Sequence, residues 1–436
     1  MASIIIIGGK ESGVGAALLG LSLGYEVMVS DAGPIISPFR EELQRSGIAF
    51  EEGGHSEGLA DTFDFMVVSP GVPSDSKVVT DFSISSKEVI SEIEFAWRNI
   101  GDGQIIGITG SNGKTTLSSL IYHVMEQDDQ DVKLVGNIGY SFARTLATSK
   151  SPYYVCELSS FQLDQIVHFN PKVAIITNIT PDHLDRYDND MSKYALAKFR
   201  ITENQSSEDL LILNKDDQES MNYFGKIQTN AQVIYTSSAE INEVTFTSNK
   251  GITYDISECN LRGRHNQSNV AQAIEALESI GLKKRAVESG ISTFQGLAHR
   301  LEFVANVDGV DYINDSKATN IDSVWYALDA MKKPTVWIVG GIDKGNDYSI
   351  LSELVKNKVR WMICMGLENK KLIDMFGHEV EGYDEAGSAQ EAVLKAHKAA
   401  TSGDVVLLSP ACSSFDLFKN YEDRGEQFKK AIKNLL

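Results

Sequence analysis

Short apolar runs recur along the chain and alternate with segments of helical periodicity almost throughout. β-Branched residues are frequent in these runs, which end in glycine, serine, asparagine or aspartate. Short buried strands separated by helices are typical of α/β proteins whose sheets are mainly parallel. We therefore predict an α/β fold with strands at Ile4–Ile7, Glu26–Asp31, Met66–Val68, Ala174–Ile176, Val336–Val339 and Val405–Leu408.

The alternation divides into three blocks. A chain of 436 residues is too long for one ordinary hydrophobic core and suits two or three domains. We expect three: an N-terminal Rossmann-like domain over residues 1–92, a central P-loop mononucleotide-binding α/β domain over 93–297, and a C-terminal Rossmann-like α/β domain over 298–436.

The first block has the outline of a Rossmann nucleotide site. After the strand at Ile4–Ile7, a glycine-containing loop over Glu11–Gly15 leads into a helix at Ala16–Gly24, and Asp31 ends the next strand. An acidic residue there is placed to accept a hydrogen bond from a ribose or a base. Aspartate at a strand end is also a common turn former, so both roles stay open. The later turn Ser69-Pro70-Gly71 is of a kind that holds ligands at a sheet edge.

The second block contains a glycine-rich loop between an apolar run and a helix, Thr109-Gly110-Ser111-Asn112-Gly113-Lys114-Thr115-Thr116. In such a loop the backbone N–H groups and the helix N-terminus face one concavity, a lysine adds charge, and a threonine hydroxyl can bind Mg²⁺. Each part suits a polyphosphate. The strict pattern G-x-x-x-x-G-K-[ST] fails, because Ile108 stands five residues before Gly113, and the loop is a shortened variant.

Polar residues follow two strands of this second block. Glu157 ends one strand, and His183 follows another in Thr180-Pro181-Asp182-His183-Leu184-Asp185. A carboxylate and an imidazole beside a nucleotide are plausible Mg²⁺ ligands, because Mg²⁺ takes a few protein groups together with phosphate oxygens and water. The alternatives are a helix-start role for His183 and ordinary N-cap chemistry for Asp182 or Asp185.

Two helical segments of the second block carry polar candidates. Lys198 lies on a helical pattern and, taken alone, is typical of a solvated helix lysine. Asn266 and Asn269 are three residues apart on one face of an alanine-rich helix. Their amides offer the donor and acceptor that an adenine edge requires, although helix capping by Asn266 explains the pattern equally well.

The third block repeats the design of a strand followed by a polar turn. Such turns are Asn314–Asn320, Gly340–Gly345 and Ser409–Asp416. Ligands bind at the carboxyl ends of strands in open α/β sheets, so these turns predict a second substrate with an anionic group. Cys412 has no histidine at a telling spacing and is better explained as a buried thiol than as a nucleophile.

Charge and cysteine content limit the classes of binding partner and the cellular compartment. A formal net charge of −20 and a pI near 4.9 argue against nucleic acid and anionic membrane surfaces. No apolar stretch approaches the length of a membrane-spanning helix. The four cysteines lack C-x-x-C spacing, and the chain opens into a strand-like run with no signal-peptide pattern. We expect a reduced, cytoplasmic protein.

The ordered motifs resemble those of the Mur ligases over nearly the whole chain. The resemblance is carried by Thr109–Thr116, Glu157–Leu163, His299-Arg300, Asn314–Asn320 and Ser409–Asp416. It implies an ATP-dependent amide ligase that adds D-glutamate to UDP-N-acetylmuramoyl-L-alanine in peptidoglycan synthesis. The implied reaction proceeds through an acyl phosphate and releases ADP and phosphate, with two Mg²⁺ sites. The implied protein is a monomer that binds no nucleic acid and does not insert into membranes.

The same resemblance implies a role for particular residues. Lys114, His183 and Lys198 would be catalytic, and Thr115, Glu157, His183 and Lys198 as a carbamate would hold metal. ATP would contact Gly110, Ser111, Asn112, Gly113, Lys114, Thr115, Thr116, Asn266, Asn269, Arg300, Asp315 and Lys317, which requires domain closure. The UDP-substrate would contact Ser12, Gly13, Asp31, Ser69, Pro70, Gly71, Asn137 and Ser159. D-Glutamate would contact Thr319, Lys344, Ser414, Phe415 and Tyr421.

Two rival functions share part of these features. A folylpolyglutamate synthase or another Mur ligase would share the phosphate loop, but a Rossmann-like first block argues against the folate enzymes, and the Ser409-Pro410-Ala411-Cys412 turn favours D-glutamate over a diamino acid. A P-loop switch without ligase activity would not need the polar turns of the third block.

Overall fold

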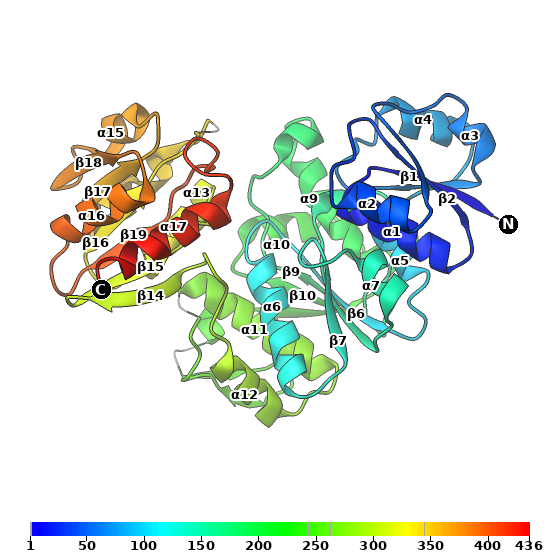
Figure 1. Cartoon of the computed structure of the whole chain (residues 1–436). Helices are drawn as coiled ribbons and strands as arrows, with labels where there is room; N and C mark the ends of the chain where they lie inside the picture. Colours follow the sequence, from blue (N-terminus) through cyan, green and yellow to red (C-terminus); the bar gives the residue numbers. More distant parts are fainter. Residues whose placement is uncertain (1, 242–243, 262, 344) are drawn as a thin grey trace. The chain divides into compact units, whose positions relative to one another are not determined.

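The computed structural model describes every residue except 1, 242–243, 262 and 344. The chain divides into two compact units, one made of residues 1–258 and 268–294, the other of residues 259–267 and 295–436. Figure 1 colours the first unit mainly from blue to green and the second mainly from yellow to red. In the part of the chain that is described, no helix is long and apolar enough to cross a membrane.

The N-terminal sheet in the first unit is five-stranded and wholly parallel, in the order β3-β2-β1-β4-β5. This confirms the predicted Rossmann-like character of the first block. The strands are β1 (Ser3–Ile7), β2 (Glu26–Asp31), β3 (Ala49–Glu52), β4 (Phe65–Val68) and β5 (Val89–Ser91), and the helices are α1 (Glu11–Ser22), α2 (Phe39–Arg45), α3 (Leu59–Thr62), α4 (Lys77–Ile84) and α5 (Glu92–Trp97).

Helix α1 begins at Glu11 rather than at Ala16, so the expected loop over Glu11–Gly15 is wrong. The glycines serve close packing inside the helix. A Cβ at Gly13 would lie 1.7 Å from the carbonyl oxygen of Gly8, and one at Gly15 would lie 2.0 Å from Oγ of Ser141. Only glycine lets α1 approach so closely both the end of β1 and Ser141, the N-cap residue of α7 (Phe142–Thr148).

The central sheet is six-stranded and parallel, in the order β11-β10-β9-β6-β8-β7. Its central strands are nearly all buried, as expected for a parallel sheet covered on both faces. The strands are β6 (Gln104–Thr109), β7 (Val132–Gly136), β8 (Tyr153–Glu157), β9 (Val173–Ile176), β10 (Leu210–Asn214) and β11 (Gln232–Thr236). The helices that accompany it are α6 (Lys114–Gln127), α7 (Phe142–Thr148), α8 (Ser160–Leu163), α9 (Met191–Phe199), α10 (Gln218–Phe224) and α12 (Lys284–Thr293), with 3₁₀ helices η1 (Leu184–Tyr187), η2 (Arg200–Thr202) and η3 (Ser238–Glu240) and the hairpin β12 (Thr245–Thr247) and β13 (Thr253–Asp255).

The sheet of the second unit is mixed, in the order β14-β15-β19-β16-β17-β18. Among the described strands of this sheet, β14 pairs antiparallel with β15 and the other pairs are parallel. The strands are β14 (Glu302–Val307), β15 (Val310–Asn314), β16 (Thr335–Val339), β17 (Val359–Met365), β18 (Gly382–Ala386) and β19 (Val405–Leu408), and the helices are α13 (Ile321–Ala330), η4 (Tyr348–Leu351), α14 (Ser352–Lys358), α15 (Lys370–Phe376), α16 (Ala389–Ala399) and α17 (Tyr421–Lys433). Helix α11 (Arg264–Ser279) contains residues of both units.

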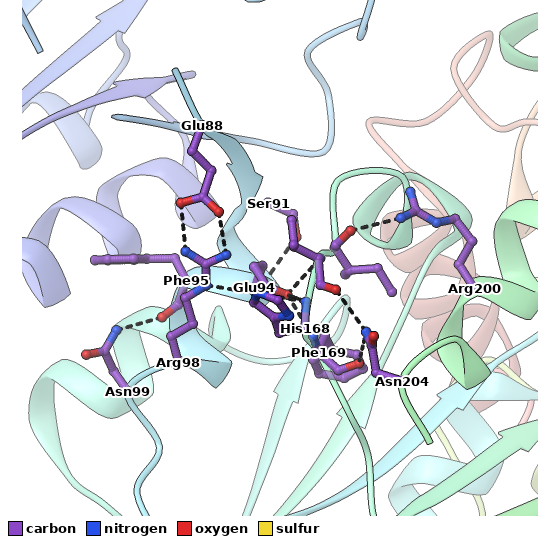
Figure 2. A network of polar contacts seen from close by, with 12 residues as sticks. Glu88, Ser91, Glu94, Phe95, Arg98, Asn99, His168, Phe169, Arg200 and Asn204 are labelled. Atoms are coloured by element: carbon purple, nitrogen blue, oxygen red, sulfur yellow. Dashed lines mark hydrogen bonds and ion pairs between the residues drawn. The ribbon is translucent and has the colours of Figure 1, made fainter. Parts of the chain in front are cut away.

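A buried carboxylate, Glu94 of α5, joins the N-terminal sheet to the central sheet (Figure 2). Its oxygens accept the backbone N–H groups of Val167, His168 and Phe169 at 2.8–3.1 Å. Nε–H of Arg98 donates to Oε1 of Glu94 at 2.8 Å. Both terminal nitrogens of Arg98 donate to the exposed carboxylate of Glu88, at 2.7 and 2.8 Å. This network fixes the chain before β9 against the helix that follows the first sheet.

We predict that Glu94→Gln destabilises the protein by roughly 2–4 kcal/mol, because it removes the buried charge and turns an amide donor toward backbone donors. Glu88→Gln is the matched control, because it removes the exposed partner of the same arginine and should cost less than about 1 kcal/mol. Urea denaturation of both variants measures the difference. Equal midpoints for the two variants would contradict the role of Glu94.

Candidate functional site

The glycine-rich loop joins β6 to α6, with Gly113 in the N-cap position. Gly110 and Gly113 have φ angles of 142° and 84°, which favour glycine. A Cβ at Gly110 would lie 1.9 Å from Oγ1 of Thr177, and one at Gly113 would lie 2.8 Å from Oδ1 of Asn269. Conformation and space both require glycine, and the loop leads directly into the N-terminus of α6, where phosphate cradles form in proteins.

The loop is held by the segment after β9. Ser111 Oγ donates to the carbonyl of Thr180 at 2.8 Å, and the N–H of Asn112 donates to Oδ1 of Asn178 at 2.9 Å. Oγ1 of Thr177 donates back to the carbonyl of Asn112 at 2.6 Å. These bonds connect loops that are distant in sequence, so the cradle is preorganised by the fold.

Two lysines converge on one carbonyl of the loop. Nζ of Lys114 lies 2.6 Å and Nζ of Lys198 lies 2.8 Å from the carbonyl oxygen of Gly110. Lys198 is only 2% exposed and lies over the ring of Tyr194. Its pKa is lowered well below the ordinary value, first by burial and then by the charge of Lys114. The expectation of a solvated helix lysine is therefore wrong, because α9 turns this residue toward the phosphate loop.

Glu157, at the end of β8, is buried beside the loop's helix and the end of β7. Its Oε1 accepts Nδ2 of Asn137 at 2.9 Å, and its Oε2 lies 3.4 Å from Oγ of Ser118 in α6. The structure thus brings together the predicted metal ligand Glu157 and the predicted substrate residue Asn137. Ser159, two residues on, is the N-cap of α8 in a capping box with Gln162.

His183 starts the 3₁₀ helix η1 and has a positive φ of 51°. Its side chain is 60% exposed, lies 3.6 Å from the carboxylate of Asp182, and packs against the ring of Phe161, four residues after Glu157. The helix-start explanation and the metal-ligand prediction are compatible, since the backbone caps η1 while the ring stays accessible.

The donors near the loop fit Mg²⁺ as a partner of a bound phosphate. Among the described residues no group of three or more His, Cys, Asp or Glu side chains is arranged to hold a metal. Mg²⁺ commonly uses one or two carboxylates and completes its shell with substrate phosphates and water. A buried carboxylate at Glu157 and the hydroxyls that open α6 match that habit.

In the first sheet, Asp31 organises its own loops. Oδ2 accepts the N–H of Gly9 at 2.6 Å, and Oδ1 accepts the N–H of Gly33 at 2.8 Å. The turn after β4 approaches the same loop, since Oγ of Ser69 lies 3.4 Å from the carbonyl of Gly8. The turn-former role is confirmed, and contacts of Ser12, Gly13, Asp31, Ser69, Pro70 and Gly71 with a uridine diphosphate stay predictions.

In the second unit, Asp315 is buried at the end of β15. Oγ of Ser409 donates to Oδ2 at 2.8 Å, and the N–H of Leu301 donates to Oδ1 at 3.2 Å. Burial nevertheless raises the pKa of Asp315 to about 7. The turns after β15 and β19 therefore meet at this carboxyl group.

Arg424 of α17 ties the same two turns together and was missed as a functional candidate. Only 1% exposed, it donates Nε to Oγ of Ser316 at 3.0 Å and its terminal nitrogens to the carbonyls of Ser316 and Cys412 at 2.8 and 3.2 Å. The only sequence signal was an arginine next to Gly425 in the last helix. Cys412 is itself buried, as expected, and burial raises the pKa of its thiol.

The predicted amino-acid site lies around these turns. Nζ of Lys317 lies 3.7 Å from the ring centre of Tyr421. Ser414 is buried, whereas Phe415 is 67% exposed. Thr319 lies in the turn before α13, and Lys344 lies outside the described residues. Of the predicted ATP contacts, Gly110–Thr116 and Asn269 belong to the first unit, and Asn266, Arg300, Asp315 and Lys317 belong to the second. A joint role for the two sets stays a prediction.

Parallel sheets, a glycine loop that opens a helix, and convergent lysines define an α/β protein of the nucleotide-binding P-loop class. Three family models match successive segments: the MurD N-terminal domain at residues 16–78, the Mur ligase middle domain at 108–277, and the Mur ligase glutamate ligase domain at 299–412. The chain belongs to the Mur ligase family and has its three-domain α/β fold.

One relative is the UDP-N-acetylmuramoylalanine--D-glutamate ligase of Cytophaga hutchinsonii, 46% identical over 98% of both chains. The solved UDP-N-acetylmuramate-alanine ligase MurC of Thermotoga maritima shares the fold at 17% identity, with a TM-score of 0.61 over 100% of both chains. The MurF ligase of Thermotoga maritima, solved in complex with ADP, is 14% identical with a TM-score of 0.61 and covers 91% of this chain and 92% of its own.

We predict that Asp315→Asn stabilises the protein relative to the wild type more at pH 8 than at pH 5. The folded-state pKa of about 7 exceeds the ordinary value of 3.8, so the folded wild type holds a proton that the unfolded chain releases. Wild-type stability from this group therefore falls as pH rises from about 4 to 7, and the asparagine variant lacks that loss.

Asp311→Asn on the same strand is the control of opposite sign. The pKa of Asp311 is lowered, because bonds from Lys333 and Asn306 outweigh the effect of burial. The wild type gains stability from this group as pH rises through the acidic range, so Asp311→Asn should become less stable relative to the wild type as pH rises. Thermal unfolding of both variants at several pH values measures the two trends, and parallel trends would contradict the assignment for Asp315.

Proposed function

We propose that this chain is an ATP-dependent amide ligase that adds D-glutamate to UDP-N-acetylmuramoyl-L-alanine during peptidoglycan precursor synthesis, forming ADP and phosphate. The observation that carries the proposal is the full-length similarity to a ligase with that name, at 46% identity over 98% of both chains. A likeness confined to the phosphate loop would support only nucleotide binding.

The reaction needs an activated carboxylate. A carboxylate is a poor acyl donor, so the alanyl carboxylate of the UDP-substrate first attacks the γ-phosphorus of ATP and becomes an acyl phosphate while ADP leaves. The amine of D-glutamate then attacks the acyl carbon, and phosphate leaves through a tetrahedral intermediate. Both steps gather negative charge, so they depend on positioned cations and N–H donors.

The phosphate loop supplies those groups. We infer that the N–H groups of Gly110–Lys114 hold the β- and γ-phosphates and that the ammonium of Lys114 follows the transferred phosphoryl group. This ammonium donates to the carbonyls of Gly110 and Ser111 at 2.6 and 2.7 Å. We infer that it can also donate to phosphate oxygens, since an ammonium has three N–H donors.

When bound, Mg²⁺ neutralises and aligns the phosphate oxygens. We infer two ions, held by Glu157, His183, a hydroxyl of Thr115 and Lys198 in carbamate form. The lowered pKa of Lys198 supports the carbamate, because only a neutral amine attacks CO₂. The modification would also place an anion beside the ammonium of Lys114.

We infer further that the uridine diphosphate contacts Ser12, Gly13, Asp31 and the Ser69-Pro70-Gly71 turn, with Asn137 and Ser159 nearer the alanyl end. D-Glutamate would contact Thr319, Lys344, Ser414, Phe415 and Tyr421. Asn266, Asn269, Arg300, Asp315 and Lys317 would complete the ATP site on domain closure. We expect the enzyme to work in the cytoplasm as a monomer.

With UDP-N-acetylmuramoyl-L-alanine, ATP and Mg²⁺, we expect ADP release with D-glutamate and none with L-glutamate or diaminopimelate. A coupled ADP assay measures the release, and mass spectrometry identifies a product heavier by one glutamyl residue. Release that ignores both substrates would contradict the ligase function. Release with L-glutamate or diaminopimelate but not with D-glutamate would contradict only the specificity.

We predict that Lys198→Ala lowers kcat by about 100-fold or more, as loss of one electrostatic stabiliser does, and that acetate partly restores it by replacing the carbamate. Lys193→Ala is the matched control, because Lys193 lies on the same helix but is exposed and paired with Asp188. Activity assays with and without acetate measure both. Unchanged wild-type activity in bicarbonate-depleted buffer would count against the carbamate.

A further inference from the structure

The aromatic ring of Phe161 packs against three residues of the segment that begins with His183. The ring centres of Phe161 and His183 are 5.3 Å apart, and those of Phe161 and Tyr187 are 6.0 Å apart in a stacked arrangement. The guanidinium carbon of Arg186 lies 4.3 Å from the centre of the same ring. The position of the His183 imidazole is thus set by the contacts of η1 with Phe161.

Arg186 also reaches the N-terminal sheet within the same unit. Its terminal nitrogen donates to the carbonyl of Val72 at 2.9 Å. The N–H of Val72 in turn bonds to the carbonyl of Ser69 at 3.0 Å and closes the Ser69–Val72 turn. A narrow crevice lined by Ser69, Pro70, Phe161 and Arg186 lies at this junction. One side chain therefore connects the turn after β4 with the residues around His183.

The backbone around Arg186 needs such an anchor. His183, Asp188 and Asn189 have φ angles of 51°, 55° and 57°, all in the left-handed region. Each costs some conformational energy in a residue other than glycine, so the segment keeps this shape only if its surroundings hold it. Figure 1 locates the segment in the loop between β9 and α9.

We propose that Arg186 is a positioning residue that couples the Ser69–Val72 turn to His183, so that binding of the UDP-substrate at the turn strengthens Mg²⁺ binding at the central sheet. This inference rests on the proposed function, which assigns the turn to the uridine diphosphate and His183 to the metal. Arg186 acts through the two groups that it contacts, the Val72 carbonyl and the Phe161 ring. It transmits a displacement of the Val72 carbonyl to the first turn of η1, and hence to the imidazole.

The coupling is reciprocal. If bound UDP-substrate raises the affinity for Mg²⁺ by a given factor, Mg²⁺ raises the affinity for the UDP-substrate by the same factor. Binding of UDP-N-acetylmuramoyl-L-alanine, measured by calorimetry with and without saturating Mg²⁺ and without nucleotide, therefore reports the coupling without any turnover. Direct pairing of Mg²⁺ with the pyrophosphate contributes equally in every variant.

We define the Mg²⁺ factor as the fold increase in UDP-substrate affinity that saturating Mg²⁺ causes. This factor should be at least about 5-fold larger in the wild type than in Arg186→Ala, because 5-fold is the lower end of common allosteric couplings. Arg40→Ala is the matched control. Arg40 also lies over an aromatic ring, that of Phe50, and bonds to a carboxylate, Glu52, but it has no contact with the turn or with η1 in the described residues. It should keep the wild-type factor.

An equal Mg²⁺ factor in the wild type and in Arg186→Ala would overturn the proposal, and so would a wild type whose binding ignores Mg²⁺. If the wild type does not bind the UDP-substrate at all, the proposed function is refuted as well. If the wild type ligates D-glutamate but Arg186→Ala shows the same Mg²⁺ factor as the wild type, only the coupling is refuted.

Arg186→Gln guards against a variant that does not fold. The glutamine keeps a planar N–H donor for the Val72 carbonyl and removes the charge over the Phe161 ring. Its Mg²⁺ factor should lie between those of Arg186→Ala and the wild type, while its thermal unfolding temperature stays near that of the wild type. A wild-type factor in this variant would contradict the role of the guanidinium.

Discussion

The structure depends above all on the approach of two lysine side chains, Lys114 and Lys198, to one carbonyl oxygen, that of Gly110. Two protonated amines that share one neutral acceptor would repel each other, at a cost that grows as solvent is excluded, and after burial this is one reason why the pKa of Lys198 is lowered. The arrangement becomes favourable when an anion enters or when one amine loses its charge. A polyphosphate would supply the first condition and the proposed carbamate the second, so the loop suits ligands that bring negative charge.

The rest of the first unit keeps this loop in register with the N-terminal sheet. Glu94 holds three consecutive backbone N–H groups before β9, and Arg144 of α7 bonds to Glu11 and Glu42 of the first sheet's helices at 2.8 and 2.5 Å. A rigid connection has a chemical consequence. If the uridine diphosphate is anchored at the first sheet, its alanyl carboxylate arrives near the γ-phosphate without a further search, which is how positioning lowers a barrier.

The sequence predicted those parts of the structure that depend on local residue patterns, namely the strands and the phosphate loop. The β-branched runs gave the strands, and glycines at Gly110 and Gly113 gave the phosphate loop, because those residues determine their own backbone. The start of α1 at Glu11 and the burial of Lys198 could not be predicted, since each depends on a neighbour from elsewhere in the chain. The antiparallel β14 was not predicted although its signal is local, because Asp308-Gly309 between Val307 and Val310 is a typical hairpin turn. Arg186 and Arg424 were not identified as candidate residues, because their hydrogen-bond partners Val72 and Ser316 are 114 and 108 positions away in the sequence.

Arg424 illustrates why such distant pairings persist. Burial lowers the pKa of its guanidinium to about 10, so it stays charged at neutral pH, yet its bonds go to a hydroxyl and two carbonyls rather than to a carboxylate. Replacement of a buried charge by apolar side chains is often neutral or stabilising, so stability alone does not account for this residue. Its planar fork reaches the turns after β15 and β19 at once, which no apolar side chain does. The arrangement gives up stability for a fixed geometry at the edge of the sheet where both turns present their polar groups.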